Sequence, residues 1–348
     1  MTAKTDRRKP RRLFRPRTAP QRPLVTVLVC NHNYERYVAA AIDSVLAQTY
    51  RPVEVLVIDD GSTDGSRRLL AGYRDRVRII LKANGGQASA VNLGFRESRG
   101  EYICFLDADD LFRPDKVARV VEVFERNPDV GWVYHELDYV DSDGKPLPLA
   151  SLPDPANVRA VMTRRARYRE TSFLDLRSYY AAGHRSPYTC PAFSALSFRR
   201  TTLAAILPMP EDIARASDEF PKIAAVALFP GVHVAVSLAE QRIHPANAAT
   251  ARTDAAVDQS LRYVKTAYHL RRRFAQIGPT ADKWFASSFG RVIGLAGART
   301  AFAAEESRRY LRDYFGPATW LRQVPRIALH ATRESLRRVR RDGQLDRR

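Results

Sequence analysis

The sequence predicts an α/β protein built on a mainly parallel sheet, with helices on both faces and a helical extension at the C-terminus. Three observations support this. In the first 140 residues, apolar segments of strand length alternate with segments whose apolar residues recur at helical spacing. The strand segments are apolar throughout, as expected for strands that are covered on both faces of a sheet. From about residue 255 onward the pattern is helical only.

Each element of the N-terminal half has its own local signal. The strands are short apolar runs bounded by turn residues, and we expect them at 24–30, 53–59, 77–82, 101–107 and 131–140. The helices have apolar residues three and four positions apart, and we expect them at 34–48, 63–73, 86–98 and 113–127. Thr63 or Asp64 is a candidate cap for the second helix, and Pro114 lies near the start of the fourth.

The second half of the chain is less regular. Residues 150–215 show no clear pattern, and residues 215–250 return to a helix and a strand. The apolar stretch 223–239 is interrupted by Pro230 and Gly231, so we expect a buried helix, a turn and a strand rather than a membrane span. The chain is therefore expected to comprise a disordered basic tail, an α/β domain and a helical region with a basic amphipathic end, over 1–23, 24–250 and 251–348.

The net charge of +19 is concentrated at the two ends of the chain. Residues 1–23 carry nine Lys or Arg and one acid, and residues 320–348 carry nine Arg and three acids, so the ends together supply +14. In the second segment Leu329, Leu336 and Val339 form a thin apolar stripe beside the arginines. This pattern is compatible with contact to an anionic membrane surface, and a solvated terminal helix is the alternative.

Polar and acidic residues follow each of the first four predicted strands. The segments are "CNHN" at 30–33, "DDGSTDGS" at 59–66, "ANGGQ" at 83–87 and "DADD" at 107–110. In an open parallel sheet, ligands bind beyond the carboxyl ends of the strands. We therefore expect these four segments to meet at one edge of the sheet and to form the functional site.

Two clusters of carboxylates at one edge require compensation. Two unit charges about 5 Å apart at an effective dielectric of roughly 20 repel by about 3 kcal/mol, so either the acids bind protons or a cation lies among them. Oxygen ligands without a Cys/His cluster favour a hard ion, Mg or Mn, which commonly shares its shell with phosphate. The chain has neither a G-x-x-x-x-G-K-[ST] loop nor a G-x-G-x-x-G after the first strand. A nucleotide bound here would hold its diphosphate through the metal.

Two segments carry a resemblance to a known family. Residues 25–66, with "VIDDGSTD", and residues 84–110, ending in "LDADD", resemble the family 2 inverting glycosyltransferases with their D-x-D motif. The resemblance is strong over 24–145 and continues to about 250. It implies the GT-A fold, a Rossmann-like mixed sheet, and a divalent cation, Mg or Mn. It also implies transfer from a nucleotide-diphosphate sugar to a hydroxyl of a glycan or lipid-linked acceptor, as in cell envelope polysaccharide biosynthesis.

The resemblance also implies roles for donor-site residues. Asp60 matches the carboxylate that meets the nucleotide base, and Asp59 matches an acid that shapes the same pocket. Where the family often has Pro-Thr-Tyr-Asn against the nucleoside, this chain has Cys30, Asn31, His32 and Asn33. An aromatic stack on the nucleotide would then come from His32, which leaves the identity of the nucleotide base open. The segment on the other side of the nucleotide contributes Asn84, Gly86 and Asn92. The glycines there also suit a tight turn.

The D-x-D motif supplies the metal ligands that the resemblance implies. Asp109 is expected to bind the metal, and Asp107 to lie near the metal or the ribose. Asp110 is expected to cap the following helix instead. His244, within "QRIHPAN", matches a family segment that completes the metal shell or contacts the diphosphate, although a lone histidine is often structural.

The acceptor side is expected to begin near 190–203, and it leads to "ASDEF" at 216–220. An inverting transfer needs a general base for the acceptor hydroxyl. The resemblance implies Asp218 in this role, with Glu219 as the second choice. Acids that open a helix also complement its dipole, which is the structural alternative.

Other classes of protein fit the sequence less well. A nucleotidyltransferase would share the metal–nucleotide site, but it usually has a basic, glycine-rich loop where "CNHNYE" stands. A basic, non-enzymatic nucleic-acid-binding protein would have acidic strand ends that repel phosphates, so no nucleic acid is expected. A catalytically inactive scaffold would not need the acids that are all present here, namely Asp60, Asp107, Asp109 and Asp218. Three widely spaced cysteines and no apolar segment after the basic N-terminus predict a cytoplasmic protein, compatible with peripheral contact at the inner face of the membrane.

Overall fold

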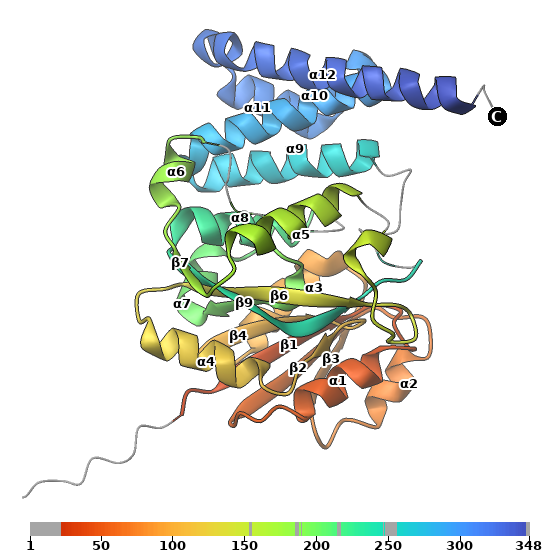
Figure 1. The fold of residues 1–348 in the computed structure, drawn as a ribbon, viewed down its shortest axis with the longest axis vertical. Helices are drawn as coiled ribbons and strands as arrows, with labels where there is room; N and C mark the ends of the chain where they lie inside the picture. The colour runs from red at the N-terminus through yellow and green to blue at the C-terminus, as the bar shows by residue number, and fades with distance from the viewer. Residues whose placement is uncertain are drawn as a thin grey trace, which may run out of the picture.

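The computed structural model describes residues 22–345, apart from 153–154, 185–187, 189, 214–216, 246 and 248–255. Almost all of the basic tail expected over 1–23 therefore lies outside the described residues. The remainder forms one sheet covered by helices, followed by a group of C-terminal helices stacked at the end of the molecule away from the sheet (Figure 1).

The described strands form one nine-stranded sheet in the order β3-β2-β1-β4-β8-β6-β9-β5, with β7 paired to β9. Strands β1 to β4 are parallel to one another, and β6 is parallel to β9, while β8 runs antiparallel between β4 and β6. The predicted mixed, mainly parallel sheet is therefore confirmed. The strands are β1 Val25–Asn31, β2 Val53–Asp60, β3 Arg78–Lys82, β4 Tyr102–Asp107, β5 Leu111–Phe112, β6 Trp132–Val140, β7 Ser172–Leu174, β8 Leu196–Arg199 and β9 Gly231–Arg242.

Alternate residues of each central strand enter two different cores. On β1, Val25, Val27 and Val29 pack against one set of helices, and Leu28 packs against the other. The first set comprises α1 Val38–Leu46, α2 Ser66–Ala71 and α4 Lys116–Arg126. The second set includes α3 Gly86–Glu97, α7 Arg200–Ile206 and α8 Glu219–Leu228. Both faces of the sheet are thus buried, which explains why the strand sequences are apolar without alternation.

Several elements differ from expectation. Strands β5, β7 and β8 were not predicted, and helices α5 Pro155–Arg167 and α6 Arg177–Ala181 lie in the segment that showed no pattern. Helix α2 begins at Ser66, later than expected, and the candidate cap Asp64 accepts a hydrogen bond from the Ser66 amide at 3.0 Å. The stretch 223–239 forms the end of α8, a turn and β9, as predicted. No helix among the described residues is both long and apolar enough to span a membrane.

The C-terminal region contains helices α9 Ala256–Arg273, α10 Gly278–Ala303, α11 Glu305–Tyr314 and α12 Pro317–Leu345. They bury a core of their own, which includes Phe285, Phe289 and Tyr310. Helix α12 packs closely on α10 because Gly290 and Gly294 have no side chain there. A Cβ atom at either glycine would lie 2.4 Å from a backbone oxygen of α12.

Candidate active site

The carboxyl ends of β1 to β4 lie at one edge of the sheet, in matching register. Asn31 at the end of β1 pairs with Asp59 of β2, and Cys30 pairs with Asp107 of β4. Asp60 pairs with Lys82 at the end of β3. The polar segments that follow these strands are therefore neighbours in space, as the sequence predicted.

Asp59 is completely buried and holds the loop that follows β2. Its carboxylate accepts hydrogen bonds from Asn31 Nδ2 at 2.8 Å, from the Ser62 amide at 3.1 Å and from Arg67 Nε at 2.8 Å. Burial alone would raise the pKa of Asp59, but the bonds from Ser62, Arg67 and Asn31 outweigh it and lower the pKa. Asp59 therefore stays ionised and fixes the loop that follows β2.

Asp60 lies beside the residues that were expected to contact the nucleoside. Its Oδ1 accepts from Lys82 Nζ at 2.5 Å and from the Gly85 amide at 2.9 Å. The Asp60 carbonyl oxygen lies 2.8 Å from Nδ1 of His32, and Asn84 Nδ2 lies 3.2 Å from Nε2 of the same ring. Asp60, His32 and Asn84, which are distant in sequence, thus converge on one small region.

The remaining donor-site predictions fall into two groups. Asn33 has a positive φ of 59° and accepts a bond from the Thr63 amide at 2.7 Å, and Gly86 has a φ of 83° that favours glycine. Both residues therefore set turns around the pocket. Asn92 is buried and exchanges two hydrogen bonds with the backbone of Met209, at 2.9 and 2.7 Å. Its amide joins α3 to a distant loop, which is a structural use of the side chain.

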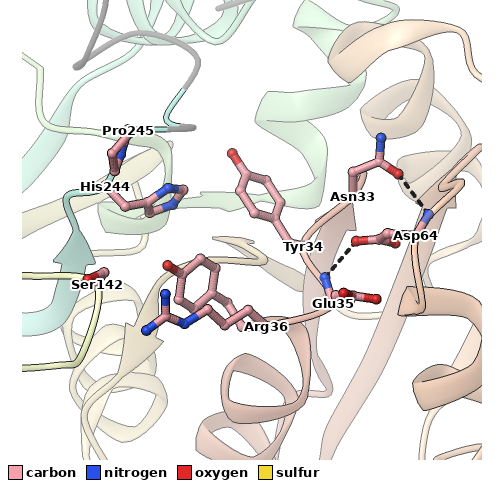
Figure 2. Close-up of a pocket in the computed structure, with 9 residues that line it drawn as sticks. Asn33, Tyr34, Glu35, Arg36, Asp64, Ser142, His244 and Pro245 are labelled. Carbon is pink, nitrogen blue, oxygen red and sulfur yellow. Dashed lines mark hydrogen bonds between the residues drawn. The ribbon is translucent and has the colours of Figure 1, made fainter.

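Asp109 of the D-x-D motif is buried among polar and aromatic groups from three segments. His244 Nε2 lies 3.1 Å from Asp109 Oδ2, and Asn247 Nδ2 donates to the same oxygen at 2.9 Å. The Tyr34 hydroxyl is also hydrogen-bonded to Asp109, and burial raises the pKa of Tyr34, followed by the charges of Asp109 and Asp107. His244 therefore reaches the expected metal ligand. Figure 2 shows the rings of Tyr34 and His244, whose centroids are 5.7 Å apart.

Asp110 is not a helix cap, and this prediction was wrong. Helix α4 begins after Asp115, and the Asp110 carboxylate is turned into the interior instead. It accepts from Ser194 Oγ at 2.5 Å and from the Arg242 amide at 2.9 Å. Both partners are far away in sequence, so the D-x-D loop is tied to the segment before β8 and to the end of β9.

The three acids of the motif are crowded. Burial raises the pKa of Asp107 to about 8, and the charges of Asp109 and Asp218 add to the effect. Burial also raises the pKa of Asp110, followed by the charges of Asp109 and Asp107. The cluster therefore binds protons in place of a full set of charges. Among the described residues, no group of three or more His, Cys, Asp or Glu side chains is arranged to hold a metal ion.

This chemistry fits a divalent cation that shares its shell with a ligand. Carboxylates suit Mg or Mn, and a cation would remove the repulsion that now favours protonation. Asp109 and His244 lie 3.1 Å apart and are available as ligands, whereas Asp107 does not complete a group of three with them in this structure. With so few protein ligands, the remaining positions would belong to diphosphate oxygens and water.

On the acceptor side, Asp218 stands directly before helix α8 and forms an ion pair with Lys222. The Lys222 ammonium lies 3.2 Å from Glu219 Oε1, and the lysine is buried. Burial would lower the pKa of Lys222, but Asp218 and Glu219 together outweigh it and raise the pKa. The expected base Asp218 is therefore held by a buried cation. The charge of Asp218 raises the pKa of Asp107.

Some residues of the site were not predicted, namely Tyr34, Lys82, Lys222 and Asn247. A cavity of about 380 Å³ opens beside Tyr34 and His244, between the loop after β1 and the segment after β9 (Figure 2). The positions of the two lysines could have been predicted from the sequence. Lys82 ends a predicted strand, and Lys222 follows Asp218 by one helical turn. Tyr34 stands next to "CNHN", the segment in which the family resemblance implies an aromatic residue.

Comparison with known proteins identifies the α/β part of the chain. Residues 26–195 match the family model Glycosyl transferase family 2. An uncharacterized glycosyltransferase of Nostoc sp. is 44% identical over 135 residues, which cover 38% of this chain and 42% of that protein. Chondroitin synthase of Escherichia coli is 36% identical over 125 residues, or 35% of this chain and 18% of the relative. These matches span less than half of each relative.

Two solved structures share the fold over most of the chain. TarS of S. aureus (residues 1–349), in complex with UDP-GlcNAc, superimposes with a TM-score of 0.59 at 17% identity, and the match covers 90% of this chain and 91% of that one. The mannosyltransferase PcManGT from Pyrobaculum calidifontis, in complex with GDP-Man and Mn2+, gives a TM-score of 0.50 at 19% identity, over 91% and 88%. The strand-end site, the family match and the shared architecture lead to one conclusion: residues 26–195 belong to glycosyltransferase family 2, and the chain has the GT-A fold.

Proposed function

We propose that the protein is a metal-dependent, inverting glycosyltransferase that moves a sugar from a nucleotide-diphosphate sugar to an acceptor hydroxyl. The observation that carries the proposal is the approach of two acidic groups, one at the end of β4 and one at the start of helix α8. Asp107 and Asp109 lie on one side, and the Asp218–Lys222 pair lies close enough for the Asp218 charge to act on Asp107. A donor and an acceptor that meet between these groups would have a leaving-group site and a base.

For the donor, the proposal assigns the nucleoside to the region around Asp60, His32 and Asn84. The diphosphate would lie near Asp107 and Asp109, beneath the Tyr34–His244 pair. A divalent cation held there by Asp109, Asp107 and His244 would act as a Lewis acid for the departing diphosphate. Two structural neighbours support this assignment of ligand class, since one is a complex with UDP-GlcNAc and the other with GDP-Man and Mn2+.

For the transfer, Asp218 would act as the general base. The acceptor oxygen attacks the anomeric carbon from the side opposite the diphosphate, and its proton passes to the Asp218 carboxylate. The bond from the anomeric carbon to the diphosphate oxygen breaks, and the electron pair leaves with the nucleotide. The configuration at the anomeric carbon is therefore inverted. Lys222 would orient the Asp218 carboxylate for the proton transfer through their ion pair.

We propose a hydroxyl of a glycan or lipid-linked acceptor as the receiving group, and a cytoplasmic protein that touches the inner face of the membrane. A hydroxyl acceptor fits the carboxylate of Asp218, because a hydroxyl must lose its proton as it attacks the anomeric carbon. The name of one relative, chondroitin synthase, belongs to an enzyme of glycan synthesis and supports the glycan class.

The proposal is tested by measuring nucleotide diphosphate release from a panel of nucleotide sugars in the presence of Mn or Mg. We expect release with at least one donor, its loss in Asp109→Ala, and its loss on addition of a chelator. Asp218→Asn is expected to bind the donor as the wild type does and to lose transfer. Equal activity in wild type and Asp109→Ala, or loss of donor binding in Asp218→Asn, would contradict the assigned roles.

A further inference from the structure

Helix α12 has an outward face that is unusually apolar for a solvent-exposed surface. Of the eleven large hydrophobic residues that are exposed among the described residues, four lie on this helix. They are Leu321, Val324, Leu329 and Leu336, with 82%, 46%, 47% and 57% of their surface exposed. We call these four residues the α12 outer face. At 100° per residue they fall within one arc of the helix, so they form one stripe.

This face is held outward by the packing of the opposite side of the helix. Gln323, Ile327 and Glu334 are buried. The close approach of Gly290 and Gly294 to the backbone of α12 leaves little room for the helix to rotate on α10. The stripe is therefore a fixed surface and not the result of a loosely attached terminal helix.

The charges beside the stripe are all of one sign. Arg322, Arg333 and Arg337 are exposed along its edge. Glu334 is the one acid between residues 317 and 337, and it is buried in ion pairs with Arg291 at 3.4 Å and Arg337 at 2.9 Å. The surface around the α12 outer face thus presents arginines and apolar side chains. Among the described side chains of this helix, no carboxylate is exposed.

We propose that the α12 outer face docks on an anionic lipid surface, with the helix lying in the interface and its arginines at the level of the headgroups. An apolar stripe flanked by arginines is the pattern of a helix that lies on a membrane, and each arginine near an anionic leaflet adds to the attraction. A second copy of the chain is a poorer occupant, because a two-fold contact would bring the two rows of arginines together. The inference rests on the proposed contact with the inner face of the membrane and names the surface that makes it, and its test does not depend on glycosyl transfer.

The location of the face allows a clean test. Helix α12 lies at the end of the molecule away from the sheet, with α9 and α10 between them (Figure 1). Substitutions on this face should therefore leave the strand-end site unchanged. The variant Leu321→Ser/Leu329→Ser/Leu336→Ser removes the apolar stripe and keeps every charge, including those of the basic N-terminal segment. Leu69→Ser/Met162→Ser/Val236→Ser is a matched control, because these residues are exposed to a similar extent elsewhere.

The experiment is co-sedimentation of the full chain with vesicles of phosphatidylcholine alone and of phosphatidylcholine mixed equally with phosphatidylglycerol. We expect the wild type and the control to bind the anionic vesicles and to release them as salt is raised. The α12 variant should bind at least about tenfold more weakly, with an unchanged thermal transition. Equal binding by the α12 variant would overturn the proposal, as would equal binding of the wild type to both kinds of vesicle. A concentration-dependent dimer that the α12 variant loses would assign the face to a second copy instead.

Discussion

Replacement of Lys222 by methionine tests how the proposed base is held. Lys222 is buried, forms an ion pair with Asp218, and lies 3.2 Å from Glu219 Oε1. Methionine has a similar length and no charge, so the variant removes the cation and leaves the volume nearly filled. Two acids then remain beside Asp107 without their shared partner.

The expected size of the effect follows from the distances. At about 4 Å and an effective dielectric of roughly 20, one ion pair corresponds to about 4 kcal/mol. This is equivalent to about three pH units of displaced protonation, and it is an upper limit because water can enter the vacated site. The pKa of Asp107, already raised to about 8, should rise further, since the charge of Lys222 lowers it in the wild type.

Two assays follow the change. The acidic limb of the pH profile of kcat/KM should move to higher pH by about one to three units, because Asp107 keeps its proton to higher pH once the charge of Lys222 is gone. The free energy of unfolding should fall by about 3 kcal/mol at neutral pH, and by less in acid, where the acids are neutral in both states. The folded variant binds more protons than the unfolded chain, so its stability declines as pH rises.

A matched control is Lys265→Met, which removes a partly buried lysine that is paired with Glu306 at 2.9 Å in the helical region. This control should leave the pH profile unchanged. The reasoning would be refuted by a Lys222→Met profile that coincides with that of the wild type while the protein remains folded. A shift of equal size in the control would also refute it.

Three further predictions concern single residues. Asp109→Asn should raise the Mn concentration needed for half-maximal donor binding by at least about tenfold, as measured by calorimetric titration. The variant should not lose stability, because it removes one of the crowded charges. Asn92→Ala breaks two buried hydrogen bonds with Met209, so thermal unfolding should show a loss of about 1–3 kcal/mol, and an increased KM for the donor would contradict the structural role. Burial lowers the pKa of Lys116 to about 7 from 10.5. Between these two pH values the unfolded state binds more protons than the folded state. The free energy of unfolding of the wild type should therefore rise across that range by at most about 1.4 kcal/mol per pH unit. Lys116→Met should lack this slope in denaturant titrations, and retention of the slope would show that Lys116 does not cause it.

The sequence predicted the elements whose signals are local. The buried strands β1, β2 and β4 are mainly apolar, and their polar ends follow from parallel topology. The short strands β5, β7 and β8 were missed, because two to four residues carry no periodicity and are defined only by their neighbours in the sheet. The GT-A fold was expected from the family resemblance and is confirmed by comparison with solved structures.

At the site, residue types could be read from sequence, but their partners could not. Asp110 looked like a helix cap because a helix follows it, yet its partners Ser194 and Arg242 are 84 and 132 residues away. Asn92 lies in the expected donor segment, but its amide is turned toward Met209. Contacts across such distances depend on tertiary packing, which no local pattern reports. The roles assigned to the donor, metal and base residues stay predictions.

We propose that the acids at the strand ends form a metal-dependent site for a nucleotide diphosphate. Isothermal titration of UDP and GDP into the full chain, with Mn present and with chelator, tests it most directly. We predict binding of at least one nucleotide that requires Mn and is abolished in Asp109→Ala. Binding of the same affinity with chelator present, or an unchanged affinity in Asp109→Ala, would contradict the account.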